Sequence, residues 1–251
     1  MTLHPQPAAV PAADPAAVEE ALVDRLRRPG AGLLLDLDGT LVDSEPVHRA
    51  AFADYFAARG WDVPESVVRQ FMGRRATEVF PVLDGPWRGE DPVALTDAVV
   101  AQLRRTTARP VTVAGAAELL AVCAEVGLPA AIVTSARREW VDRALEALRS
   151  DVAGLDVPTM VTAEDCTEGK PHPEPYERGA RLLGLDPAGL VAAEDAPAGI
   201  DSARAAGVGY VVGMTTSNGV DELPGADAVL PDLVVVVRAV RRSRGGRVGP
   251  R

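Results

Sequence analysis

Six short apolar runs, separated by longer helical patterns, constrain the fold of this chain more than any other feature of its sequence. The runs are rich in Ala, Val, Leu and Ile, and we predict strands at residues 32–37, 129–134, 158–162, 190–194, 208–212 and 228–230. Between them, apolar residues recur at helical spacing, and several of these patterns end near a glycine. Strands that are apolar throughout and alternate with helices form a parallel sheet covered on both faces. The sequence therefore predicts an α/β fold with a doubly wound, Rossmann-like parallel sheet.

One long segment breaks this alternation. From residue 46 to residue 110 the sequence has helical patterns and no convincing strand, and Ser44 with Pro46 provides a helix start. Because the segment follows the first strand directly, we expect it to lie above the carboxyl ends of the strands, where doubly wound sheets bind ligands. We predict an inserted α-helical cap at residues 46–110 on an α/β core made of residues 30–45 and 111–238.

The two ends of the chain are predicted to lie outside this core. Residues 1–29 are rich in Ala and Pro and lack the basic and apolar parts of a secretory signal. We interpret them as a flexible leader, in which a short helix could form from residue 15 to about residue 28. Residues 239–251 are basic and Gly-rich, and we interpret them as a flexible tail.

Composition argues against several classes of partner. The 251 residues carry a formal net charge of −10, which disfavours general binding to nucleic acid or to an anionic membrane. No run approaches the roughly 20 apolar residues that span a bilayer. Cys123 and Cys166 form no ligand cluster and fit a reducing compartment, so we expect a cytoplasmic protein. The choice between a monomer and a homodimer stays open.

Acidic pairs close two of the predicted strands. Asp36 and Asp38 follow the first strand in the run DLDGT, and Glu194 and Asp195 close the strand at residues 190–194. Close anions repel one another and lose hydration when they are buried, so such acids need cations around them. Four acids at one edge of a sheet offer the hard oxygen ligands that Mg²⁺ prefers. The sequence therefore predicts a magnesium site at this edge.

A hydroxyl group and a lysine are expected at the same edge. Thr134 and Ser135 stand where a strand turns into a helix, so a hydroxyl and N-terminal amides can point at an anion. Lys170 lies in the Pro-rich run GKPHPEPY. These groups suit an oxyanion. An oxyanion, a metal and a carboxylate nucleophile together meet the requirements of phosphoryl transfer.

Taken in order, DLDGTL, the Thr134 strand end, Lys170 and the run EDAPAGI resemble the four motifs of the haloacid dehalogenase superfamily. The helical insertion resembles the cap of the subgroup with a helical-bundle cap. GKPHPEPY and EDAPAGI look like the corresponding runs of sugar- and polyol-phosphate phosphatases, of the glycerol-phosphate and 2-deoxyglucose-6-phosphate type. The resemblance covers roughly residues 30–236. It implies an Mg²⁺-dependent phosphatase acting on a small phosphorylated sugar or polyol.

The resemblance also implies a role for each acid. Asp36 is expected to be the nucleophile that takes the phosphoryl group as an aspartyl-phosphate. Asp38 is expected to be the general acid for the leaving alcohol and then the base for water. Mg²⁺ is expected to bind the Asp36 carboxylate, the Asp38 main-chain carbonyl and Asp195. Glu194 would assist the metal directly or through water.

Further residues are assigned to the phosphate and the rest of the substrate. The resemblance implies that the Thr134 hydroxyl and the Ser135 amide hold phosphoryl oxygens, while Lys170 neutralises the charge shared by nucleophile and phosphate. His48 faces the mouth of the sheet if the first cap helix begins near residue 46. Arg75 lies in the run GRRATE, at the position of a loop that selects substrate in relatives with this cap.

One further arginine and three tryptophans complete this assignment. Arg137 follows Thr134 at the same mouth and is also expected to contact substrate. The tryptophans are interpreted as packing residues rather than stacking platforms: Trp61, Trp87 and Trp140.

Two other functions are weighed. A phosphomutase resembling β-phosphoglucomutase shares the cap and the histidine at the position of His48. A second phosphate would then be bound by Arg75, Arg137 and Arg138. The chain has no obvious cap lysine to pair with that histidine, although Arg104 or Arg105 could substitute, so hydrolysis is favoured. A catalytically silent regulatory protein on the same fold fits the intact motif set less well.

Overall fold

A parallel sheet forms the centre of the computed structural model, which describes residues 14–106 and 108–245. Six strands pair in the order β5-β4-β1-β6-β7-β8, and every pairing is parallel. The strands are β1 (Gly32–Leu35), β4 (Ala130–Val133), β5 (Thr159–Val161), β6 (Leu190–Glu194), β7 (Tyr210–Met214) and β8 (Ala228–Leu230). Each overlaps one of the predicted runs, so the predicted doubly wound α/β fold is confirmed.

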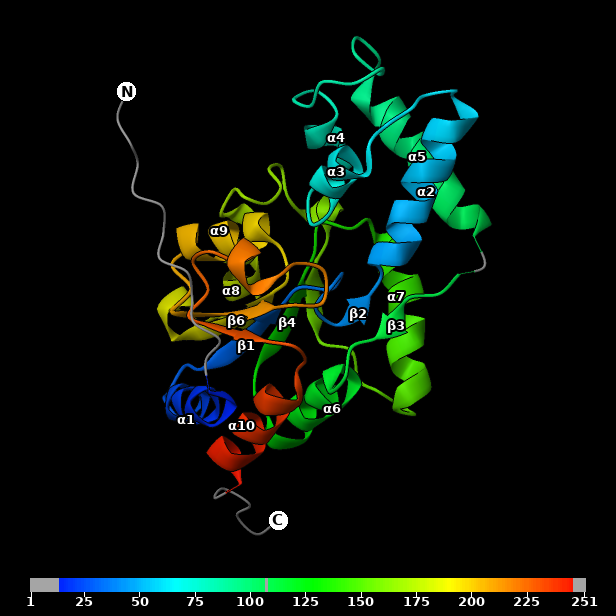
Figure 1. Cartoon of the computed structure of the whole chain (residues 1–251). Coiled ribbons are helices and arrows are strands. Elements are labelled where there is room, and N and C mark those ends of the chain that lie inside the picture. Colours follow the sequence, from blue (N-terminus) through cyan, green and yellow to red (C-terminus); the bar gives the residue numbers. More distant parts are fainter. Residues whose placement is uncertain (1–13, 107, 246–251) are drawn as a thin grey trace, which may run out of the picture.

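Helices cover both faces of this sheet (Figure 1). Along β1, Leu33 and Leu35 pack into one hydrophobic cluster and Leu34 into another, because successive side chains of a strand point to opposite faces. The first face is covered by α1 (Pro15–Leu26), α6 (Ala116–Val126), α7 (Arg138–Asp151) and α10 (Val234–Arg244). The second face is covered by α8 (Glu174–Leu183) and α9 (Pro197–Ala205). Short 3₁₀ helices occupy Ala163–Asp165, Pro187–Gly189 and Val220–Glu222.

Strand β1 lies where the strand order reverses, with β4 along one edge and β6 along the other. The connections diverge at such a point and leave a crevice at the carboxyl ends of the strands. The chain turns sharply there: Gly39 has φ 80°, and its amide donates to the Val42 carbonyl at 2.7 Å. A Cβ at Gly39 would lie 1.9 Å from Oδ2 of Asp195, so only glycine lets this turn approach the second acidic pair so closely.

The helical segment between the first two core strands rises above this edge of the sheet (Figure 1). Two antiparallel strands of two residues each, β2 (Val42–Asp43) and β3 (Val111–Thr112), join it to the core. The segment contains α2 (Glu45–Ala58), α3 (Glu65–Val68), a 3₁₀ helix (Arg69–Phe71), α4 (Ala76–Val79) and α5 (Pro92–Arg105). The sequence analysis did not predict β2 and β3, because two residues are too few to show a period.

Aromatic side chains form the interior of this cap. All four phenylalanines of the chain lie in its hydrophobic cluster: Phe52, Phe56, Phe71 and Phe80. Trp87 stacks on Phe56 with ring centroids 5.3 Å apart, and Trp61 packs at the edge of the same cluster. The packing role predicted for these two tryptophans is therefore confirmed. Aromatic rings bury much apolar area per residue, which a small helical layer without a sheet needs.

Both ends of the described chain pack on the core. The helix expected from residue 15 is present as α1, but it belongs to the fold rather than to a flexible leader, and α10 includes the first part of the predicted tail. Helix α1 packs against α10, and Glu19 binds Arg238 at 2.8 Å and Arg242 at 2.7 Å. The buried apolar residues of α1 are Val18, Leu22, Val23 and Leu26. They lie at positions i, i+4, i+5 and i+8 and form one buried stripe, which the Ala/Pro-rich composition of the whole segment concealed. Residues 15–26 and 239–244 are thus part of the fold, while residues 1–13 and 246–251 lie outside the described chain.

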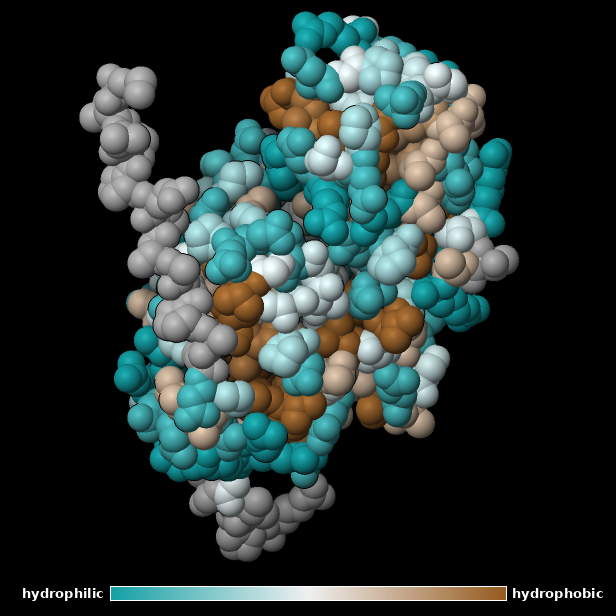
Figure 2. Space-filling model, in the orientation of Figure 1, coloured by the Kyte–Doolittle hydropathy of each residue, from teal (hydrophilic) through white to brown (hydrophobic). Residues whose placement is uncertain are grey.

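The surface of the described residues is mixed. Figure 2 shows several hydrophobic patches set among hydrophilic residues on one face. Large apolar side chains are exposed on separate segments, at Val82, Val93, Val111, Leu182 and Val234. Among the described helices, none combines the length and the apolar character needed to cross a membrane.

Candidate active site

A buried lysine and two carboxylates form the centre of the candidate site. Asp36 directly follows β1, Glu194 ends β6, and Lys170 comes from the loop before α8. The Lys170 ammonium donates to Oδ1 of Asp36 at 2.5 Å, to the Val133 carbonyl at 2.9 Å and to Oε1 of Glu194. Only 1% of Lys170 is exposed. The structure therefore brings together three residues that the sequence analysis placed at one sheet edge, although they are up to 158 positions apart.

Negative charge is in excess at this centre. One oxygen each from Asp36, Glu194 and Asp195 lie within 4.8 Å of one another, and these three carboxylates face the single Lys170 ammonium. Burial, and then the charge of Glu194, raises the pKa of Asp36 well above its usual range. Burial and Glu194 likewise raise the pKa of Asp195 to about 8. Burial alone would lower the pKa of Lys170, but Asp36 and Glu194 outweigh it and raise that pKa.

The arrangement of the acids fits a small, hard cation. Oδ1 of Asp195 is buried and has no hydrogen-bond partner among the described residues. Oε1 of Glu194, by contrast, already accepts from Lys170 and from the Tyr176 hydroxyl, the latter at 2.7 Å. An unpartnered buried carboxylate oxygen is costly unless a cation faces it. Oxygen ligands on two or three close carboxylates suit Mg²⁺, with Asp36 and Asp195 better placed to bind it directly than Glu194.

Two hydrogen-bond donors hold the Asp38 side chain in place. Its Oδ1 accepts from the Ser44 hydroxyl at 2.5 Å and from the indole N–H of Trp140 at 2.7 Å. Ser44 precedes α2 but its side chain does not cap that helix, because it bonds to Asp38 instead. The Asp38 carboxylate is therefore held in one orientation by Ser44, which lies between β2 and α2, and by Trp140 of α7.

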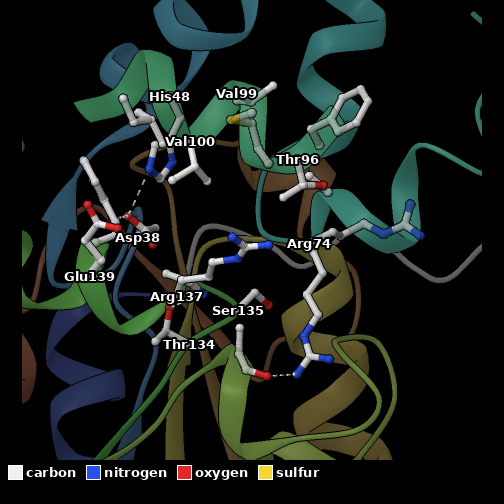
Figure 3. Close-up of a pocket in the computed structure, with 18 of the residues that line it drawn as sticks. Asp38, His48, Arg74, Thr96, Val99, Val100, Thr134, Ser135, Arg137 and Glu139 are labelled. Carbon is white, nitrogen blue, oxygen red and sulfur yellow. Dashed lines mark hydrogen bonds and ion pairs between the residues drawn. The ribbon is translucent and has the colours of Figure 1, made fainter. Parts of the chain in front are cut away.

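His48 approaches the same carboxylate from the cap, as Figure 3 shows. Its Nε2 lies 4.0 Å from Oδ1 of Asp38, and its ring packs on Trp140 with centroids 4.5 Å apart. Burial lowers the pKa of His48, while the nearby Asp38 opposes that shift. His48 thus faces the mouth of the sheet as the sequence analysis expected.

A cavity of about 710 Å³ separates the core from the cap above these residues. Asp36, Asp38 and Thr134 line its floor, and cap residues such as Val99 line its roof (Figure 3). The Thr134 hydroxyl is almost fully buried and accepts from the Ala136 amide at 3.0 Å. The Ser135 hydroxyl donates to the Gly73 carbonyl of the cap at 3.4 Å. Ser135 is therefore a point at which floor and cap meet.

Among the described residues, several arginines around the cavity, though not Arg74, have side chains bound to groups of the protein itself. Arg137 reaches into the cavity (Figure 3). It also binds Asp97 of the cap at 2.6 Å. Arg104 binds Glu139 of the core through Nε at 2.7 Å and Nη2 at 2.5 Å.

Arg75 differs most from the sequence-based expectation. It borders the cavity, but its guanidinium donates to the carbonyls of Ala163 at 2.8 Å, Cys166 at 3.1 Å and Thr167 at 3.2 Å. A guanidinium turned toward main-chain carbonyls is not directed at a substrate. Sequence spacing placed Arg75 in the correct loop but carried no information about the direction of its side chain.

Two residues of the site were not predicted from the sequence. Trp140 was interpreted as a packing residue, yet its N–H holds Asp38. Its place in the first turn of the helix that follows Thr134 is the feature that could have identified it. Tyr176 was not singled out; it is fully buried, and its hydroxyl donates to Glu194. Only its position six residues after Lys170 pointed toward the site.

Comparison with known proteins places this geometry in a family. The profile described as haloacid dehalogenase-like hydrolase matches residues 33–212. The validoxylamine A 7'-phosphate phosphatase of Streptomyces hygroscopicus subsp. limoneus is 38% identical over 208 residues, which cover 81% of this chain and 94% of that protein. Hexitol phosphatase A of Escherichia coli (strain K12) is 38% identical over 205 residues, which cover 80% of this chain and 91% of that protein.

Solved structures agree at the level of the fold. The β-phosphoglucomutase of Clostridium difficile matches with a TM-score of 0.64 at 20% identity, over 80% of this chain and 90% of that one. At that identity the likeness concerns the fold alone. The profile covers most of the chain, and the two phosphatases match it over most of their own length. The chain belongs to the haloacid dehalogenase-like hydrolase family.

Proposed function

We propose that the protein is an Mg²⁺-dependent phosphatase that hydrolyses a small sugar or polyol monophosphate through an aspartyl-phosphate on Asp36. The observation that carries this proposal is the Asp36 carboxylate, bound from behind by Lys170 at the floor of a cavity covered by the cap. The names of the two curated relatives support it, since one is a phosphatase of validoxylamine A 7'-phosphate and the other a hexitol phosphatase.

In the first half of the reaction, a carboxylate oxygen of Asp36 attacks the phosphorus of the bound ester. The bond between phosphorus and the ester oxygen breaks, and the leaving oxygen takes a proton from the Asp38 carboxyl group. The Ser44 hydroxyl and the Trp140 N–H keep that carboxyl group oriented. The products are the free alcohol and a phosphoryl group on Asp36.

In the second half, Asp38 takes a proton from water as the water oxygen attacks phosphorus. The bond between phosphorus and Asp36 breaks, which releases inorganic phosphate, restores the Asp36 carboxylate and leaves Asp38 as the protonated carboxyl group with which the cycle began. Lys170 stays bonded to Asp36 and Glu194 and offsets negative charge at the phosphoryl group throughout. The Thr134 hydroxyl and the Ser135 amide are proposed to hold phosphoryl oxygens.

Asp36, Asp195 and the Asp38 main-chain carbonyl are proposed to hold Mg²⁺, with Glu194 assisting directly or through water. When bound, Mg²⁺ supplies positive charge that favours the ionised nucleophile and stabilises the phosphoryl oxygens. Glu194 has a second role, because its Oε1 accepts hydrogen bonds from both the Lys170 ammonium and the Tyr176 hydroxyl.

The rest of the substrate would occupy the cavity below the cap. Its volume of about 710 Å³ lies within the range of roughly 300–1,000 Å³ that is usual for small-molecule sites. His48 and Arg137 are proposed to contact the sugar or polyol part, since both border the cavity near Asp38. In the phosphomutase alternative, Arg104 could replace the cap lysine that pairs with the histidine. In the structure, however, its Nε and Nη2 donate to the two carboxylate oxygens of Glu139.

A substrate panel tests the proposal. The protein is incubated with Mg²⁺ and a series of sugar, polyol and nucleotide monophosphates, p-nitrophenyl phosphate and validoxylamine A 7'-phosphate, and released phosphate is measured. We expect Mg²⁺-dependent release that is fastest for a sugar or polyol ester. Conversion of a sugar 1-phosphate to its isomer with glucose 1,6-bisphosphate would favour the mutase instead. No turnover of any ester would favour a regulatory protein.

A further inference from the structure

The cap binds the loop that leads into Lys170. Besides its three carbonyl contacts with residues 163–167, Arg75 lies 3.4 Å from Oε1 of Glu78, one turn further along α4. The same Oε1 accepts from the Gly169 amide at 2.9 Å. Arg75, which directly precedes α4, and Glu78 within α4 thus bind carbonyls and the last amide of this loop, which we call the lysine loop (residues 163–169).

The core fixes the lysine loop from the opposite side. The Glu174 carboxylate, in the first turn of α8, accepts from the Thr167 amide at 3.0 Å and from the Glu168 amide at 2.7 Å. The loop is therefore held between one acid of the core and an arginine–glutamate pair of the cap. Only 11% of the Arg75 side chain is exposed, so its bonds compete little with water.

There is no spare room at the joint between cap and loop. A Cβ on Gly169 would lie 2.8 Å from Cδ of Arg75 and 2.8 Å from both carboxylate oxygens of Glu78. Gly169 immediately precedes Lys170, whose ammonium makes all three of its bonds to buried acceptors of the core. A shift of the loop main chain would therefore move the base of a side chain whose tip has no freedom to compensate.

We propose that Arg75 and Glu78 are positioning residues for Lys170, through which docking of the cap sets the placement of the catalytic lysine. The catalytic part of this inference rests on the proposed phosphatase function. The planar guanidinium fork of Arg75 spreads its N–H donors over three carbonyls, a geometry that the compact ammonium group of a lysine does not reproduce. The pair couples the two layers of the enzyme: the lysine is in place when the cap is in place.

Kinetics on two substrates separate this role from a substrate contact. Arg75→Ala is compared with the wild type on the best sugar or polyol phosphate and on p-nitrophenyl phosphate. Misplacement of Lys170 should lower kcat by about 10- to 100-fold on both, with KM on p-nitrophenyl phosphate nearly unchanged. Arg75→Lys should fail to restore kcat. Arg88→Ala, which breaks the exposed Arg88–Asp84 pair elsewhere in the cap, is the matched control and should behave as the wild type.

A rise in KM confined to the sugar phosphate would overturn the proposal and make Arg75 a substrate contact. Wild-type kcat on both substrates would overturn it as well. Melting temperatures are measured in parallel, because a loss that follows unfolding alone also contradicts a positioning role.

Gly169→Ala provides a second test that does not remove the arginine. The added methyl group should lower kcat about 10-fold in the wild type, where it meets Arg75 and Glu78. In a background of Arg75→Ala with Glu78→Ala, the same substitution should cost less than about 2-fold, because residues in contact are not additive. Equal losses of kcat in the two backgrounds would show that Arg75 and Glu78 do not position the lysine loop.

Hydrogen exchange gives a readout that is independent of turnover. The Gly169 amide is bonded to Glu78, so its exchange should accelerate at least about 10-fold in Glu78→Ala, with Arg88→Ala unchanged. If this acceleration is seen while no ester is hydrolysed, the coupling stands and the proposed function fails. If turnover is normal and exchange is unchanged, the proposed function stands and the coupling fails.

Discussion

The core and the cap of this molecule are packed from different residues and contribute differently to the site. The core packs Ala, Val and Leu against a sheet and presents charged groups at the strand ends, where Asp36 and Glu194 share the buried Lys170. The cap packs aromatic rings and presents to the cavity apolar side chains and arginines. Among the arginines that line the cavity, Arg75 and Arg104 of the cap bind acceptors of the core, and Arg137 of the core binds Asp97 of the cap.

This difference separates the residues that we propose carry out the reaction from those that border the route by which a substrate enters the cavity. Groups such as Asp36 and Lys170 hold one another inside the core, which is where we propose that the reaction takes place. The contacts of the cap, such as Arg137 with Asp97, cross from one layer to the other and can be exchanged when a substrate enters. Variants of the core should therefore affect every substrate, whereas variants of the cavity roof should discriminate between substrates.

The largest effect is expected at the nucleophile. Asp36→Asn replaces a carboxylate by an amide, which is a poor nucleophile, and should lower kcat/KM at least about 1,000-fold on every ester. Asp54→Asn, on the exposed side of α2, is the matched control. Activity within tenfold of the wild type would contradict the assignment of Asp36 and with it the division between core and cap.

The second effect concerns the metal. Asp195→Asn removes a carboxylate whose Oδ1 has no other partner, and should raise the half-saturating Mg²⁺ concentration about 10- to 100-fold. Asp201→Asn on the exposed side of α9 should leave it unchanged. If the Mg²⁺ dependence of Asp195→Asn equals that of the wild type, the second acidic pair does not hold the metal.

The third effect tests the orientation of Asp38. Trp140→Phe keeps an aromatic ring at this position but removes the indole N–H that donates to Asp38. A charge-assisted hydrogen bond is worth roughly 1.5–3 kcal/mol, so kcat/KM for a sugar or polyol phosphate should fall at least about 10-fold. p-Nitrophenyl phosphate should lose less, because its leaving group needs little protonation. Trp61→Phe in the cap is the control. A loss of equal size on both esters would indicate that Trp140 supports the fold rather than the acid.

The fourth effect is a difference between substrates. Arg137→Ala removes a half-exposed side chain that bridges to the cap, so kcat/KM for the sugar or polyol phosphate should fall by only about 3- to 10-fold. Turnover of p-nitrophenyl phosphate, which has no hydroxyl groups for the cavity roof to bind, should change less than 2-fold. Equal losses would place Arg137 at the phosphoryl group and would weaken the distinction between the two layers.

The smallest effect is a dependence of stability on pH. Without metal, the pKa of Asp195 is about 8 in the folded protein and near 4 in the unfolded chain, so the folded protein binds more protons in between. The free energy of unfolding should therefore fall as pH rises from about 4 to about 8. Melting temperature with EDTA should be a few degrees lower at pH 8 than at pH 6, and Mg²⁺ should restore more of it at pH 8. A metal-free protein that melts higher at pH 8 would contradict this account.

Residues at strand ends were predictable from sequence because their positions follow from the sheet. Parallel strands end at one edge, so Asp36, Thr134 and Glu194 had to lie together once the strands were recognised. Lys170 was predictable as the lone lysine of a loop at the same edge.

Contacts between layers were not predictable in the same way. The direction of Arg75, the bond from Trp140 to Asp38 and the docking of α1 on α10 each depend on how two elements pack. Such contacts have no period and no fixed spacing along the chain. The sequence therefore identified the chemistry of the site but not the side chains that hold it in place.

Rapid acid quench during turnover tests the central claim most directly. The protein is mixed with Mg²⁺ and a sugar or polyol phosphate labelled in the phosphoryl group, quenched within the first turnover, and digested for mass spectrometry. The account predicts protein-bound phosphate that is labile to hydroxylamine, maps to the peptide containing Asp36 and is absent from Asp36→Asn. Turnover without any bound phosphate, or phosphate mapped to another residue, would contradict it.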